Sequence, residues 1–99
     1  MFYVYILYSF STSSFYKGQT SNLEERLMRH NAGSEKYTSK GTPWKLVFSI
    51  KKNSRSEAVI LEKKLKHLSR QRTIHFMLKY KEGIEGSDEL FWTKQLSEC

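Results

Sequence analysis

Apolar and polar positions alternate in three segments and predict three β-strands. Residues 2–8 are aromatic and β-branched on both alternating faces, which is typical of a strand that is covered on both sides. A polar, Ser/Thr-rich turn over 9–14 separates this strand from a returning strand over 15–20, so the two form a hairpin. A third strand is expected over 44–50, with one face formed by Leu46, Phe48 and Ile50.

Helical signals follow the hairpin. Ser21 or Asn22 can cap a helix, and the spacing Ser21-x-x-Glu24 fits a capping box. The helix is expected to run to about Asn31, with Gly33 as its stop.

Two more helices are expected after the third strand. The first begins at about Ser56, because its apolar residues recur at helical spacing: Ala58, Leu61, Leu65 and Leu68. A shorter helix is expected over 73–80. The order β-β-α-β-α-α predicts a small α+β domain, in which helices pack on a three-stranded antiparallel sheet.

Length and charge divide the chain into two parts. Its 99 residues suit one domain, which we place at residues 1–80, followed by an acidic tail over 81–99 that is partly docked or mobile. The first part contains fifteen Lys and Arg against five Asp and Glu, a net +10, whereas the tail contains two against five, a net −3. A basic domain favours binding to an anionic polymer, and nucleic acid is a better candidate than a membrane surface. The alternative is that the charge serves solubility alone.

Several classes of protein are excluded by pattern. No apolar run approaches the ~20 residues of a membrane span. The apolar start has no basic flank, so it makes a poor signal peptide. Cys99 is the single cysteine, which excludes a disulfide framework or a zinc cage within one chain. We therefore expect a cytoplasmic protein.

Tyr5 and Tyr16 are the first candidates for chemistry, because phosphate loops, G-x-S-x-G motifs and Cys/His ligand spacings are all missing from the sequence. They lie on the two strands of the hairpin. If paired residue numbers sum to an odd value near 21, both rings share one face, about 5 Å apart. A slip of one residue places them on opposite faces. The alternative is that both rings are ordinary core.

Polar groups on the predicted helices are the next candidates. Arg26 and His30 are four residues apart and therefore neighbours on a helix surface, although His30 also suits a packed, hydrogen-bonded histidine. Glu62 interrupts an apolar run, where a carboxylate is half-buried and needs a cation. In the alternative interpretation, Lys66, one turn further along the helix, forms a surface ion pair with Glu62.

Together, and in this order, these residues resemble a known pattern. It consists of Tyr3-Val4-Tyr5, Tyr16-Lys17-Gly18, Asn22-Leu23-x-x-Arg26-Leu27 with His30, and Glu57-Ala58-x-x-Leu61-Glu62. Over about residues 2–80 the chain resembles the GIY-YIG nuclease superfamily, above all its small single-domain bacterial members related to the nuclease domain of the UvrC repair subunit. It departs from the pattern by Tyr-Val-Tyr in place of Gly-Ile-Tyr, by Lys17 and Gln19, and by having no asparagine after Asn53.

The resemblance implies roles for four residues. Tyr5 and Tyr16 match the tyrosines of the two motif halves, one of which helps to deprotonate the attacking water. Arg26 matches the arginine that steadies charge on the scissile phosphate. Glu62 matches the carboxylate that holds one divalent metal ion, Mg²⁺ or Mn²⁺.

The resemblance also implies supporting positions. Gly18 matches the closing glycine, where a side chain would crowd the first helix, and Asn22 belongs to the same structural motif. His30 falls where some homing-type members have a histidine. A tyrosine with a pKa near ~10 is a poor base unless a cation lowers that pKa, which Arg26, Lys17 or metal-bound water could do.

A basic stretch is a candidate track for DNA phosphates, together with Lys17 and Arg26. Its members are Lys63, Lys64, Lys66, Arg70 and Arg72. The alternative is a solvated helix face. Because no base-reading motif is present, branched, nicked or otherwise distorted DNA is the expected substrate.

The sequence therefore favours a metal-dependent DNA endonuclease that selects structure rather than sequence and serves DNA repair or recombination. A protein partner, which the sequence does not identify, is expected to deliver so small a nuclease to its site. A non-catalytic nucleic-acid-binding module with the same fold is the alternative. A general interaction domain with an incidental basic surface is the third reading.

Overall fold

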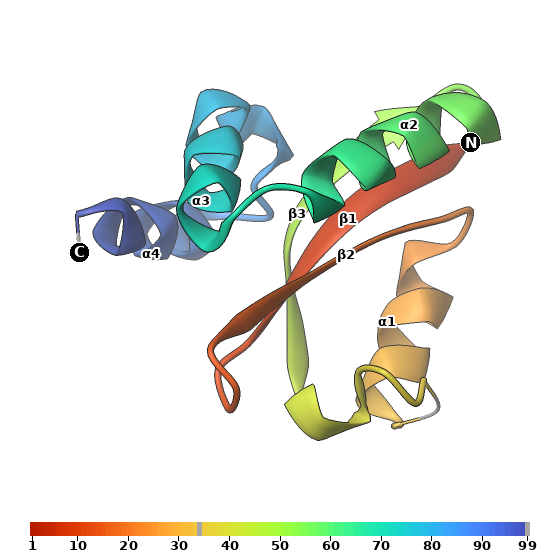
Figure 1. The fold of residues 1–99 in the computed structure, drawn as a ribbon, viewed down its shortest axis with the longest axis horizontal. Helices are drawn as coiled ribbons and strands as arrows, with labels where there is room; N and C mark the ends of the chain where they lie inside the picture. The colour runs from red at the N-terminus through yellow and green to blue at the C-terminus, as the bar shows by residue number, and fades with distance from the viewer. Residues whose placement is uncertain (34, 99) are drawn as a thin grey trace.

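A three-stranded antiparallel sheet of order β2-β1-β3 organises the computed structural model, which describes residues 1–33 and 35–98 (Figure 1). Its strands are β1 (Phe2–Ser9), β2 (Ser14–Thr20) and β3 (Trp44–Lys52). The helices are α1 (Leu23–Asn31), α2 (Arg55–Lys66), α3 (Arg70–Lys79) and α4 (Ser87–Ser97), with short 3₁₀ turns at Ser39–Gly41 and Lys81–Gly83. The α+β class and the antiparallel three-stranded sheet predicted from the sequence are confirmed.

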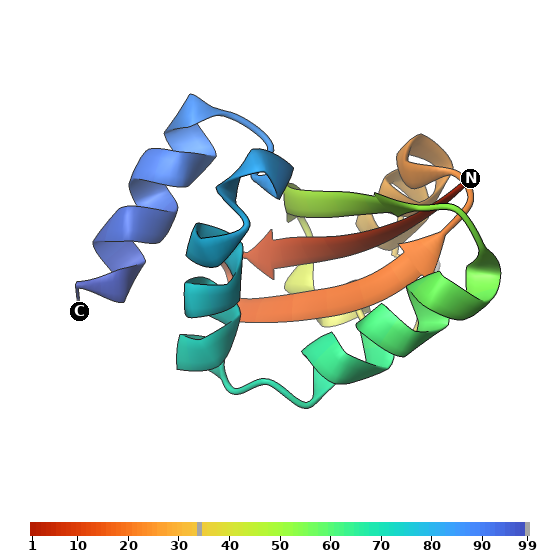
Figure 2. The same ribbon diagram turned by 90° about the horizontal axis from the view of Figure 1, so that it is seen from above.

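Helices cover both faces of the sheet, which explains why β1 is apolar on both sides. Helix α1 packs on one face, and α2 and α3 lie on the other, with α4 against α3 (Figures 1 and 2). The side chains of Val4 and Ile6 turn to α2 and α3, whereas those of Tyr5 and Leu7 turn to α1. The central strand is therefore buried along most of its length.

The register of the hairpin places the two tyrosines together. Tyr5 pairs with Gly18 and Leu7 pairs with Tyr16, so paired numbers sum to 23, an odd value. Of the two registers that the sequence left open, this is the one in which both rings share a face. The two tyrosines lie diagonally rather than directly opposite, and their ring centroids are 6.4 Å apart.

A β-bulge in β3 corrects one prediction. Ile6 pairs with Phe48 and Leu7 with Leu46, so that Val47 is an extra residue on β3. Phe48 and Val47 both pack in the core under α2 and α3, whereas Leu46 turns to the α1 side. The prediction that Leu46 shares a face with Phe48 is wrong because the bulge reverses the alternation between them.

The helix caps refine the predicted boundaries. Asn22 caps α1, and its Oδ1 accepts the backbone N–H of Glu25 at 3.1 Å. Of the two predicted caps, Asn22 is therefore the one used, and the predicted capping box between Ser21 and Glu24 is wrong. Gly33, just past the end of α1, has φ +74°, the left-handed conformation that suits a glycine stop.

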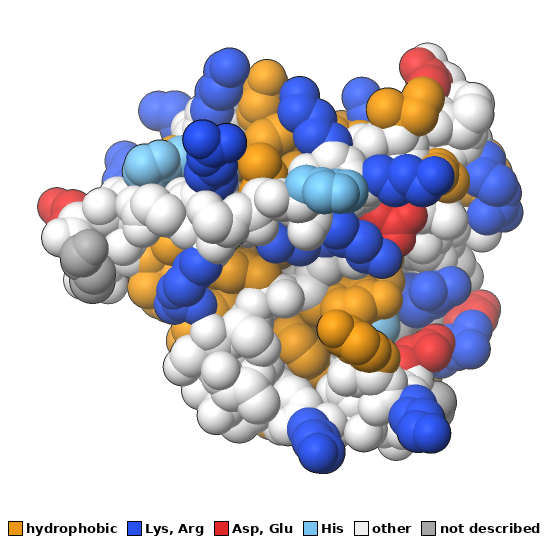
Figure 3. Space-filling model, in the orientation of Figure 1, with side chains coloured by type: hydrophobic (Ala, Val, Ile, Leu, Met, Phe, Trp, Pro, Cys, Tyr) orange, Lys and Arg blue, Asp and Glu red, His pale blue; other side chains and the backbone are white. Residues whose placement is uncertain are grey.

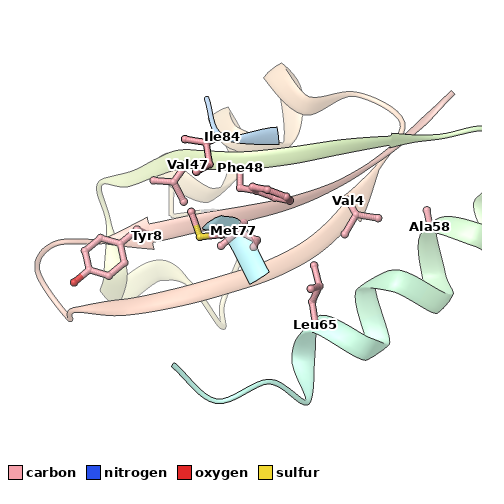
Figure 4. Packing of buried hydrophobic residues seen from close by; sticks show 9 residues of the cluster. Val4, Tyr8, Val47, Phe48, Ala58, Leu65, Met77 and Ile84 are labelled. Carbon is pink, nitrogen blue, oxygen red and sulfur yellow. The ribbon is translucent and has the colours of Figure 1, made fainter. Parts of the chain in front are cut away.

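The larger core lies between the sheet and α2, α3 and the segment that follows them (Figure 4). Its fully buried members include Val4, Phe48, Ala58, Leu65 and Met77. Each comes from an apolar position of a strand or an amphipathic helix, so burying these side chains holds the helices on this face.

Residues 81–98 pack on this same side, as contacts of Ile84, Glu89 and Trp92 show. Ile84 forms a bridge with Phe48 of β3. The Trp92 ring of α4 lies 4.7 Å from that of Tyr8, centroid to centroid, and Glu89 pairs with Lys45 of β3 at 2.9 Å. The described part of the predicted tail thus contains a helix seated on the domain; Cys99 lies outside the described residues. None of the helices in the described part of the chain is both long and apolar enough to cross a membrane.

Candidate active site

Tyr5 lies at the middle of β1, and its side chain is buried against β2. A Cβ atom added at Gly18 would lie 2.5 Å from the Tyr5 hydroxyl oxygen and 2.6 Å from Cζ. A side chain at position 18 would therefore crowd Tyr5, not the first helix as the resemblance implied. The glycine is required because the tyrosine ring crosses directly over its backbone.

The hydroxyl of Tyr5 begins a buried chain of hydrogen bonds. Its oxygen lies 3.1 Å from His30 Nε2, and His30 Nδ1 lies 2.8 Å from Thr38 Oγ1. Thr38 donates its own proton to the carbonyl of Glu35 at 3.4 Å, so it accepts from His30 Nδ1–H. In this arrangement Nε2 of the neutral imidazole has a lone pair, which accepts the proton of Tyr5.

Burial sets the protonation of both partners. It raises the pKa of Tyr5 well above its ordinary value, and the nearby Tyr16 oxygen adds to the effect. The Arg26 guanidinium opposes this rise but does not overcome it. The expectation that a cation gives a tyrosine with a low pKa is therefore wrong for Tyr5. Burial likewise lowers the pKa of His30, which keeps its ring neutral at neutral pH.

Tyr16 stands at the mouth of the same site. Its half-buried ring lies 4.9 Å from the ring of His30 and 6.4 Å from that of Tyr37. The Lys66 ammonium group lies 5.8 Å from the Tyr16 centroid. Tyr16 therefore joins the buried Tyr5–His30 pair to the outer surface.

Glu62 and Lys66 border the site from α2. Their side chains form an ion pair at 3.0 Å, and that of Glu62 is 18% exposed. The negative charge of Glu62 reaches Tyr5, where it adds, after burial and Tyr16, a smaller contribution to the raised pKa. The predicted half-buried carboxylate with a cation partner is what the structure contains.

An open cleft of about 410 Å³ lies beside Tyr16 and Lys66. Its lining consists of Phe15, Tyr16, Lys17, Tyr37 and Lys66. A second hollow of about 290 Å³ is lined in part by the same three aromatic residues. Figure 3 shows the face viewed in Figure 1, where Lys and Arg side chains gather over α2 and α3.

The predicted phosphate track divides in the structure. Lys17 and Lys66 line the cleft, and burial lowers the pKa of Lys17. Lys63 and Lys64 are exposed on α2, outside the cleft lining. Arg70 instead donates to the carbonyl of Ser13 in the hairpin turn at 2.6 Å.

Two residues of the site were missed by sequence reasoning. Tyr37 contributes a cleft wall, and Thr38 fixes the ring of His30. Both lie in the loop between α1 and β3, where no periodicity marks a residue as functional. An aromatic residue among Lys, Ser and Thr was the one available signal.

The donor set suits a hard divalent ion only in part. Among the described residues, no group of three or more His, Cys, Asp or Glu side chains gathers that could hold a metal ion. Glu62 is the carboxylate beside the tyrosines. A single carboxylate fits Mg²⁺, which retains several waters and takes further oxygen ligands from substrate phosphates.

Comparison with known proteins agrees with this arrangement. A model of the GIY-YIG catalytic domain matches residues 1–88. The UPF0213 protein of Staphylococcus haemolyticus is 41% identical over 73 residues, which are 73% of this chain and 88% of that protein. The UPF0213 protein of Natronomonas pharaonis is 41% identical over 71 residues, covering 71% and 82%.

A solved structure is also similar. The solution NMR structure of the UPF0213 protein from Bacillus halodurans is 35% identical, with a TM-score of 0.51, and the match covers 90% of this chain and 92% of that one. The likeness read from the sequence motifs is thereby confirmed. The family model spans most of the chain, and the match to each of these relatives covers more than four fifths of the relative's length. The chain therefore belongs to the GIY-YIG family, among its small UPF0213 members.

Proposed function

We propose that this protein is a metal-dependent endonuclease that hydrolyses phosphodiester bonds in DNA. One observation carries the proposal: Tyr5 and His30 are hydrogen-bonded beside Tyr16, which lines a basic cleft together with Lys66, the ion-pair partner of Glu62. A purely structural tyrosine needs neither a neutral histidine on its hydroxyl nor a neighbouring arginine and carboxylate. Membership of the GIY-YIG family supports the same reaction class.

The geometry supports a proton relay rather than a phenolate base. Because the pKa of Tyr5 is raised, its hydroxyl keeps its proton and donates it to His30 Nε2. In the proposed step, Tyr5 oxygen takes a proton from the attacking water while its own proton passes to His30. The water oxygen bonds to phosphorus, the bond to the leaving oxygen breaks, and solvent protonates that oxygen. Neutral His30 is thus the final acceptor.

Arg26 and Glu62 supply the remaining electrostatics. The half-buried Arg26 guanidinium, close to Tyr5, is placed to stabilise the added negative charge on the phosphoryl oxygens. Glu62 would hold the divalent ion, which when bound would stabilise charge on the phosphoryl and leaving oxygens. Lys66 must then exchange Glu62 for another partner; its side chain is 47% exposed, so its ammonium group can turn to solvent or to a substrate phosphate.

We further propose that the substrate is distorted, branched or nicked DNA met in repair or recombination. Phosphate contacts by lysines do not read sequence. Delivery by a protein partner and a cytoplasmic location remain predictions from the sequence.

Nicking of supercoiled plasmid tests the proposal. Wild type with Mg²⁺ or Mn²⁺ is expected to nick, and Glu62→Gln to lose at least about a hundredfold of that rate, because the charge that holds the ion is removed. Glu25→Gln removes an exposed acid of α1 and is the matched control, with circular dichroism to verify folding. Equal nicking by wild type and Glu62→Gln would contradict the proposal.

The Glu62–Lys66 ion pair also favours a second candidate, a nucleic-acid-binding module without turnover. In that case Lys66 remains on Glu62 and no metal enters. Binding that weakens steeply with salt, without cleavage of plasmid or branched DNA, would select this reading.

A further inference from the structure

Tyr37 is a large aromatic side chain that is 90% exposed beside the cleft. Its neighbour Thr38 is buried, bonds His30 through its hydroxyl and accepts the indole N–H of Trp44 at 2.8 Å. The loop is therefore anchored immediately next to Tyr37 while the Tyr37 ring remains in solvent. An exposed ring on an anchored backbone costs little ordering entropy when it binds a partner.

The surroundings of Tyr37 are basic. Lys17 and Lys66 line the cleft with it, and Lys40 lines the second hollow with it. Within the described residues, no acidic side chain lines either hollow. The charge complements phosphate, and the aromatic ring complements the flat face of a nucleobase.

We infer that Tyr37 is a stacking site for an unpaired nucleotide next to the scissile phosphate, so that the preferred substrate is DNA with a single-stranded segment. This inference rests on the proposed nuclease function, because it places that nucleotide beside Tyr16 and the catalytic groups. A base inside a duplex has both faces covered by its neighbours, whereas a base in a flap, gap or frayed end offers a face. Lys17, Lys40 and Lys66 hold the adjoining phosphates.

Binding without metal tests the inference independently of catalysis. Fluorescence anisotropy compares a labelled single-stranded oligonucleotide with a blunt duplex of the same length, at low salt and with chelator. Tyr37→Ala is expected to weaken single-strand binding by about five- to a hundredfold, the usual range for one aromatic–base stack, and duplex binding by less than about twofold. Tyr37→Phe retains the stacking face, so its single-strand affinity is expected to stay within about threefold of wild type.

Phe91→Ala is the matched control, since Phe91 is a 65% exposed aromatic residue on α4 that lines neither hollow. It is expected to leave both affinities unchanged. A 2-aminopurine base in the oligonucleotide provides a direct signal, because its fluorescence should be quenched by wild type and Tyr37→Phe but not by Tyr37→Ala.

The outcomes separate the two proposals. The stacking site is overturned if Tyr37→Ala leaves single-strand affinity unchanged, or if it lowers single-strand and duplex affinity equally. Either result overturns it even when wild type nicks plasmid. Selective loss of single-strand affinity in a protein that does not nick supports the stacking site and refutes the nuclease. Absence of binding to both probes by wild type overturns the stacking site, whereas plasmid nicking with metal decides the nuclease separately.

Discussion

The two faces of the sheet are built from different chemistry. On the side of α2 and α3, the buried cluster is apolar, and its interior includes Phe48, Leu65 and Met77. On the side of α1, the buried set combines apolar rings with a polar chain in which Tyr5 and His30 are hydrogen-bonded. Strand β1 contributes alternate residues to both.

This difference indicates a division of labour. Apolar packing stabilises the fold in proportion to the area and volume it fills, without dependence on pH. A buried polar chain adds less stability but fixes protonation states and directions, which is what proton transfer requires. Substitutions on the first face should therefore change the free energy of unfolding, and those on the second should change the rate.

Met77→Ala should produce the largest loss of stability. Met77 is fully buried in α3, so the substitution removes apolar contacts and leaves a cavity, at about 2–5 kcal/mol of unfolding free energy. Urea unfolding followed by circular dichroism measures this loss. The nicking rate per folded molecule should stay within about twofold of wild type, because α3 supplies none of the proposed catalytic groups. A large fall in that rate would show that the two faces are not independent.

Gly18→Ala should instead lower the nicking rate. Its Cβ meets the Tyr5 hydroxyl at 2.5 Å, so the ring must move away from His30. A displacement of about 1 Å at a reacting group costs on the order of a hundredfold in rate, which plasmid nicking measures.

Gly33→Ala is the matched control for this prediction. Position 33 has φ +74° and no atom within 4 Å of an added Cβ, so alanine there should cost about 1–2 kcal/mol of stability and no activity. Equal rates for Gly18→Ala and wild type would remove the Tyr5 position from the mechanism.

The sequence predicted features that depend on local periodicity. The strands and the three predicted helices follow from patterns of two and 3.6 residues. The shared face of Tyr5 and Tyr16 required an odd register, which the sequence left open and the pairing of β1 with β2 decides. The bulge at Val47 could not be predicted, because it arises from pairing with β1 and not from β3 itself. That bulge decides to which face Leu46 turns.

The same distinction holds for the site. The motif spacing placed Tyr5, Tyr16 and His30 in one region, and the structure brings them together. The positions of Tyr37 and Arg70 depend on where a loop and a helix dock. Arg70, predicted as a phosphate contact, is engaged with the hairpin turn instead, a role that no local pattern signals.

The smallest expected effect is a pH dependence that belongs to His30. Burial, then Arg26 and Arg29, lower the pKa of His30, and Glu35 only partly opposes them. Because the folded pKa lies below the unfolded value of about 6.5, the unfolded chain takes up the proton first as pH falls. Stability is therefore complete above pH ~6.5 and decreases below it, by at most about 1.4 kcal/mol per pH unit for one site.

Urea unfolding at pH 7.5 and 5.5 isolates this contribution. Between the two pH values, the unfolding free energy of His30→Gln should decrease less than that of wild type. The unfolding free energy of His75→Gln, changed at an exposed position of α3, should decrease as much as that of wild type. Nicking by wild type should fall as the pH drops through the lowered pKa of folded His30, below ~6.5, because a protonated His30 has no lone pair at Nε2 to accept the proton of Tyr5. If His30→Gln retains the full pH dependence of stability, the buried imidazole is not the titrating group, and the chemical difference between the two faces loses its main support.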